Sequence, residues 1–157
     1  MARSRTTLPN NATHRVILEA VEPEVDGGRF PAKATPGEVH VECDAFADGH
    51  DEIAVVLLYR KEGKRQWWAR RMTHAYNDRW RGSFPAPDVC RYEYTVAGWV
   101  DQWATWRKGM KKWLEAGVDV ETHLAVGAQL LEAASERAGA GTGGSGETSP
   151  EDAETLR

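Results

Sequence analysis

Hydrophobic and polar residues alternate with a period of two through the first two thirds of the chain. Val39, Val41 and Cys43 alternate with charged or polar residues, which predicts a strand with one buried face. Residues 79–84 repeat the pattern, and glycine and proline pairs interrupt it at short intervals. We therefore predict a mainly β protein, with six or seven short strands forming an immunoglobulin-like β-sandwich over residues 14–101.

Three segments extend this prediction. Residues 53–59 form an unbroken apolar run, which is typical of a central strand covered on both faces. Residues 66–73 follow a Glu-Gly turn and are predicted to be a strand of the same hairpin. In residues 91–100, Tyr92, Tyr94, Val96 and Val100 are expected to point inward and Trp99 outward.

The hydrophobic period then changes to that of a helix. Trp103, Trp106, Met110 and Trp113 share a stripe, and Gly117 is placed to end that helix. Asp119 is a suitable N-cap for a second helix that reaches about Gly139. Two apolar helices of this kind predict a helical appendage at 102–138, although Gly109 and Gly127 weaken both helices.

Both ends of the chain have a different composition. Residues 1–13 are polar and basic and are predicted to be a disordered arm. In residues 139–146 five of eight positions are glycine, so residues 139–157 are predicted to be a flexible, disordered tail.

The overall charge limits the classes of partner. A net charge of -4 over 157 residues provides no broad positive field for nucleic acid or anionic lipid. Apolar runs are too short to cross a bilayer, and no secretory signal follows the basic start. We therefore expect a cytoplasmic protein that binds neither nucleic acid nor membrane.

Cys43 and Cys90 both fall on predicted strands, where a sandwich can bring two positions face to face. A disulfide is therefore open, but the expected reducing compartment favours two free thiols.

Motifs for catalysis are missing from the sequence. It contains no phosphate-binding glycine loop, nucleophile elbow or paired metal-ligand spacing. Residues 48–52 carry Asp48, His50, Asp51 and Glu52, which could be drawn as a metal cluster but are better explained as a polar turn. We predict no catalytic, cofactor-binding or metal-binding residue, and no cofactor.

Trp99, Trp103, Trp106 and Arg107 are the candidate contact residues. Seven tryptophans are many for this length, and these four residues lie where the last strand leads into the first helix. Core packing, a partner interface and a sugar-stacking platform all use such residues. The neighbouring lysines are expected to form a solvated helix face.

The strings ADGHD, NDRWRGSF and RYEYTVAGWVDQWATWRK, in this order, closely resemble the N-terminal domain of the bacterial maltosyltransferases. The resemblance runs from about His14 to Ala134. These enzymes transfer maltosyl units from α-maltose 1-phosphate to the ends of α-1,4-glucans. The resemblance implies a β-sandwich interrupted by a helical insertion, with the last sandwich portion and the catalytic barrel encoded after residues of this kind.

The resemblance also implies a role and partners. We expect a non-catalytic scaffold or dimerisation domain, or a truncated form of the enzyme, that meets a homodimer mate or the remainder of the maltosyltransferase. The alternatives are a stand-alone α-glucan-binding module and a regulatory partner that competes for the dimer surface of an intact enzyme.

Overall fold

The computed structural model describes residues 15–140, with side chains to residue 136. The chain divides into two compact units, Met1–Thr105 and Trp106–Arg157. The predicted disordered arm at 1–13 lies outside the described residues, as does the predicted tail from residue 141 onward.

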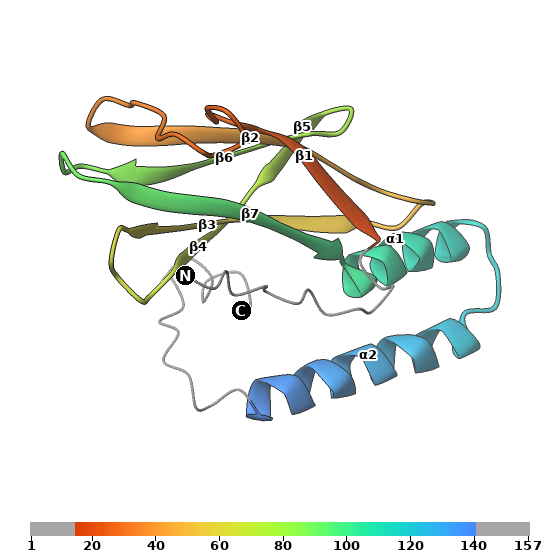
Figure 1. Cartoon of the computed structure of the whole chain (residues 1–157). Helices are drawn as coiled ribbons and strands as arrows, with labels where there is room; N and C mark the ends of the chain where they lie inside the picture. Colours follow the sequence, from red (N-terminus) through yellow and green to blue (C-terminus); the bar gives the residue numbers. More distant parts are fainter. Residues whose placement is uncertain (1–14, 141–157) are drawn as a thin grey trace, which may run out of the picture. The chain divides into compact units, whose positions relative to one another are not determined.

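The first unit contains two antiparallel sheets, which lie one above the other in Figure 1. One sheet has the order β1-β2-β6-β5 and the other the order β4-β3-β7. The strands are β1 (Val16–Glu22), β2 (Gly37–Ala47), β3 (Ile53–Lys61), β4 (Trp68–Arg71), β5 (Thr73–Tyr76), β6 (Arg79–Ala86) and β7 (Tyr92–Val100). This division of strands is that of an immunoglobulin-like sandwich, so the predicted fold class is confirmed.

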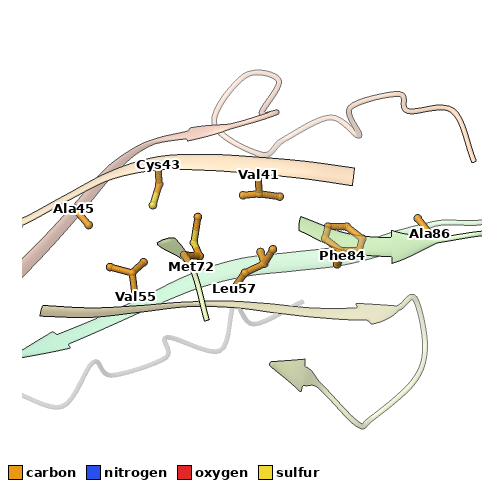
Figure 2. Packing of buried hydrophobic residues seen from close by; sticks show 8 residues of the cluster. All are labelled: Val41, Cys43, Ala45, Val55, Leu57, Met72, Phe84 and Ala86. Carbon is orange, nitrogen blue, oxygen red and sulfur yellow. The ribbon is translucent and has the colours of Figure 1, made fainter. Parts of the chain in front are cut away.

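The core lies between the two sheets (Figure 2). As the alternation predicts, Val41 and Cys43 of β2 are fully buried, and Tyr92 and Tyr94 of β7 pack against the same core. Phe84 is 1% exposed and is the largest of the fully buried side chains. The remaining buried members of the cluster are Ala45, Val55, Leu57, Met72 and Ala86.

The central strand β3 is covered less evenly than its apolar sequence predicts. Val55 and Leu57 are fully buried, whereas Val56 and Leu58 on the other face are only half-buried. The strand lies between β4 and β7, as expected for a central position.

The hairpin predicted between residues 53–59 and 66–73 is confirmed, but its second strand ends at Arg71 and does not continue to Thr73. β4 pairs with β3, and β5 pairs with β6 in the opposite sheet. Met72 alone separates the two strands and is 3% exposed, so the chain changes sheets at one buried residue. Met72 is the one buried residue among residues 68–76, so the sequence here has no alternation that could reveal the change of sheet.

Two helices follow, α1 (Gln102–Glu115) and α2 (Glu121–Ala140). Gly117 ends the first with a left-handed φ of 66°. The Asp119 carboxylate accepts the backbone N–H of Glu121 at 3.0 Å, so both predicted caps are confirmed. α2 continues one residue beyond Gly139, where the tail was predicted to begin.

Candidate functional site

Two carboxylates of the acidic turn at residues 48–52 pair with one arginine. Arg15 contacts Asp48 at 3.0 Å and Asp51 at 2.6 Å, and hydrogen bonding to Asp48 raises the pKa of the guanidinium. Among residues 15–140, no three His, Cys, Asp or Glu side chains lie close enough to share a metal ion. The turn is therefore held together by ion pairs.

Of the four candidate contact residues, Trp99 and Trp103 lie in the first unit. Trp99 is on β7, opposite Ala54 of β3, and is 49% exposed. Trp103 is in the first turn of α1 and is 38% exposed. Both indoles therefore present part of their surface to solvent.

The first turn of α1 is fixed to the sandwich by two polar groups. Asp101 accepts the backbone N–H of Ala104 at 2.8 Å and an Arg71 N–H at 3.0 Å. The Thr105 hydroxyl accepts the backbone N–H of Glu52 at 2.8 Å. Asp101 is thus an N-cap that the sequence analysis did not identify.

Trp106 and Arg107 lie in the second unit, where the helices pack through aromatic contacts. The indole N–H of Trp106 donates to the His123 carbonyl at 2.7 Å, and the Trp106 ring lies over Gly127. Trp113 stacks on the His123 ring with centroids 3.5 Å apart. Trp106 is half-buried and Arg107 is exposed.

Their positions do not test whether these residues contact a partner or a glucan. The contact role of Trp99, Trp103, Trp106 and Arg107 therefore stays a prediction. The helices of the second unit also expose apolar side chains. These are Leu114, Leu124, Val126 and Leu131.

Arg79 organises a charged cluster that the sequence analysis missed. Its guanidinium donates to Glu42 at 2.9 Å, to Asp44 at 3.1 Å and to Glu22 at 3.0 Å, joining β6 to β2 and β1. The side chain of Arg79 is 15% exposed. Hydrogen bonding from Arg79 lowers the pKa of Glu42. Strand pairing brings these charges together, and the cluster links three neighbouring strands of one sheet.

A groove beside Trp68 was also missed. It has a volume of about 500 Å³ and is formed by the β3–β4 hairpin together with the end of β6, the start of β7 and Pro87 between them. We call it the Trp68 groove. Its lining residues are Tyr59, Arg60, Lys61, Lys64, Gln66, Trp68, Pro85, Pro87 and Tyr92. The two tryptophans at 67 and 68 were the available signal, but segments about 20 residues apart form the groove.

The two cysteines are free thiols. Cys43 is buried in the core, and burial raises its pKa to about 11. Cys90 is exposed. The open disulfide alternative is therefore not realised in this structure.

Between residues 15 and 140, neither helix is long and apolar enough to cross a lipid bilayer.

The fold and its surfaces define an immunoglobulin-like sandwich domain that carries a helical extension. The family described as alpha-1,4-glucan:maltose-1-phosphate maltosyltransferase, domain N/S, matches residues 14–157. The chain belongs to this family and corresponds to its N-terminal domain, which confirms the resemblance seen in the sequence.

Curated relatives carry the same name, alpha-1,4-glucan:maltose-1-phosphate maltosyltransferase. The protein of Chlorobaculum tepidum is 49% identical over 137 residues, which is 85% of this chain and 20% of the relative. A protein of Cereibacter sphaeroides is 42% identical over 130 residues, 82% of this chain and 22% of the relative. The protein of Myxococcus xanthus is 41% identical over 128 residues, 78% of this chain and 19% of the relative. The chain thus spans about a fifth of the length of these relatives.

Proposed function

We propose that this chain is the non-catalytic scaffold domain of a cytoplasmic maltosyltransferase that extends α-1,4-glucans from α-maltose 1-phosphate. The observation that carries the proposal is the match to domain N/S over residues 14–157, together with the chain's span of about a fifth of its relatives. The reactive groups of the enzyme then belong to the other four fifths.

The second sheet offers a place for that remaining polypeptide. β7 is at the edge of the β4-β3-β7 sheet, and an immunoglobulin-type sheet has room for a further strand on that side. A hollow of about 630 Å³ lies between β7 and the segment before β2, and Tyr94 and Val96 line it. We infer that a later strand of the enzyme pairs with β7 here.

Exposed apolar side chains support a partner for the rest of the domain. Trp99 and Trp103 of the first unit and Trp106 and Arg107 of the second are the proposed contacts with the enzyme's remainder or with a homodimer mate. Tryptophan and arginine are enriched at such interfaces because they bury large areas and can still hydrogen bond. The exposed leucines of α2 would associate in the same way.

Phosphate release tests the proposal. The purified chain is incubated with α-maltose 1-phosphate and glycogen, beside the full-length Chlorobaculum tepidum relative as a positive control. We expect phosphate from the control and none from the chain. Phosphate release by the purified chain that persists when contaminating enzymes are inhibited would refute a purely scaffolding role.

A second candidate function is direct binding of α-glucan by the domain itself. The exposed indoles of Trp99 and Trp103 favour it, because sugar rings pack their C–H faces on aromatic rings. Titration of the chain with maltoheptaose tests it, and a flat tryptophan-fluorescence response at millimolar sugar would remove this candidate.

A further inference from the structure

We propose that the Trp68 groove is a binding site for an α-1,4-glucan chain. The inference rests on the proposed function, because α-1,4-glucan is named in the activity of the relatives. It adds a site within the first unit whose lining residues include neither Trp99 nor Trp103.

The aromatic part of the groove is a cross-strand pair. Trp68 of β4 lies directly opposite Tyr59 of β3, and side chains in such a pair project from the same face of the sheet. Trp68 is 46% exposed, so much of its indole is open to a ligand. A pyranose ring could pack its apolar C–H face on these rings.

Phe84 holds the tyrosines of the groove in place. The Tyr59 ring stacks on Phe84 with centroids 4.8 Å apart and an interplanar angle of 19°. Tyr92 packs on Phe84 with centroids 6.0 Å apart. Because Phe84 is in the core, these rings are ordered before a ligand arrives, which reduces the entropy lost on binding.

The charges around the groove suit a neutral ligand. Glu93 contacts Arg60 at 2.5 Å, and Asp88 pairs with Lys61, so carboxylates offset two of the three cations. The Arg60 guanidinium also lies 4.3 Å from the centroid of the Trp67 ring. A phosphate or a polyanion would find little net positive charge here, whereas a sugar needs only hydrogen-bonding groups.

Lys64 and Gln66 supply those groups. Both are exposed, and within the described part of the chain neither side chain has a hydrogen-bond or ion-pair partner. An ammonium donates hydrogen bonds, and an amide both donates and accepts them, so together they match the two roles of a sugar hydroxyl. Few polar groups over an aromatic surface are typical of small-molecule sites.

The dimensions agree with an oligosaccharide. A volume of about 500 Å³ falls within the roughly 300–1,000 Å³ usual for ligand sites. The two prolines opposite the hairpin, Pro85 and Pro87, are rigid and cannot close over the groove. A chain longer than the groove could therefore continue past it.

The test is a titration of the chain with maltoheptaose, with the heat of binding measured by calorimetry. We compare the wild-type chain with Trp68→Ala and with Tyr76→Ala, a control at an exposed aromatic residue of the other sheet that does not line the groove. We expect Trp68→Ala to weaken binding about ten-fold or more, which corresponds to ~1.4 kcal/mol, and Tyr76→Ala to bind as wild type. Cellohexaose, which has β-1,4 linkages, is expected to bind more weakly than maltoheptaose.

A spectrum of the wild-type protein tests the same site even if the Trp68→Ala variant folds poorly. In ¹H–¹⁵N correlation spectra, maltoheptaose should shift the Trp68 indole N–H and the Gln66 amide, and leave the Trp99 indole unchanged. No binding by wild type, equal binding by wild type and Trp68→Ala, a spectral shift confined to the Trp99 indole, or equal affinity for cellohexaose would each overturn the proposal. Phosphate release decides the scaffold function separately, so the two can fail independently.

Discussion

The indole of Trp106 in α1 lies against the backbone of Gly127 in α2. A β-carbon at residue 127 would be 2.3 Å from Cζ2 of Trp106, which is far inside van der Waals contact. The indole N–H also donates to the His123 carbonyl one turn earlier on α2. Gly127 therefore permits the close approach of the two helices, although glycine weakens a helix by itself.

Substitution of this glycine separates the two effects. Gly127→Ala raises helix propensity by about 1 kcal/mol, so an unobstructed site would gain stability. We expect a loss instead, because the ring must move, with faster hydrogen exchange of the amides of α2. Thermal unfolding followed by circular dichroism at 222 nm measures the stability change.

The matched control is Ala128→Gly, at the next, exposed position of α2, which changes propensity in the opposite direction without touching Trp106. The double variant Trp106→Ala/Gly127→Ala should recover part of the loss caused by Gly127→Ala. A stabilised Gly127→Ala protein would contradict the packing described for the helices.

Acid should loosen the contact between β2 and β6. Arg79 lowers the pKa of Glu42, so the charged carboxylate favours the folded state. This stabilisation is complete above the ordinary value of 4.5 and is lost as the pH falls through the lower pKa of the folded protein. We expect the melting temperature of the wild type to fall below that pH.

Glu42→Gln should reduce this acid-induced fall, because the uncharged amide does not titrate. Melting curves recorded from neutral pH down to about 3, below the usual carboxyl range, provide the comparison. Glu115→Gln, an exposed substitution on α1, should melt with the pH dependence of the wild type. Identical acid sensitivity in Glu42→Gln and wild type would exclude Glu42 as the titrating group.

The two thiols should react at very different rates. At pH 8 Cys43 is buried and protonated, since its pKa is about 11, whereas Cys90 is exposed. We expect a disulfide reagent to modify one thiol per native chain and both thiols in denaturant. Cys90→Ser should abolish the native reaction; rapid modification of two thiols without denaturant would contradict the buried position of Cys43.

Asp101 should contribute to stability through its cap on α1. Asp101→Ala removes the acceptor for the Ala104 N–H and the partner of Arg71, and loss of an N-cap costs about 0.5–2 kcal/mol. Asp101→Asn keeps a capping oxygen and should lose less. Denaturant unfolding of both variants measures the difference, and equal losses would assign the effect to the ion pair with Arg71.

The strands of the sandwich could be predicted because burial on one face imposes the period of two. Val41 and Cys43 are core residues for the same reason that they alternate with polar neighbours. The sheet change at Met72 could not be predicted, because β4 and β5 are exposed throughout and a single buried residue between them gives no periodic signal. A pattern records which face a side chain takes, and not which sheet the strand has joined.

The surfaces were less accessible to prediction than the fold. Arg79 meets Glu22 and Glu42 only because β1 and β6 flank β2, which is a pairing between distant segments. Gly127 was taken as a weakness, since its value depends on a ring 21 positions earlier in the chain. The Trp68 groove likewise requires the register of Trp68 opposite Tyr59, which no local pattern contains.

The crossing at Met72 limits where the length of this domain can vary. Arg71 is in register with Val56 on one sheet, and Thr73 with Arg81 on the other. Adding or removing one residue between them would turn the side chains of β4 or β5 to the opposite face of its sheet, because each strand is held in register by its partner. Insertions should be tolerated instead in the exposed bend around Gly63, where extra residues would deepen the wall of the Trp68 groove and leave both sheets aligned.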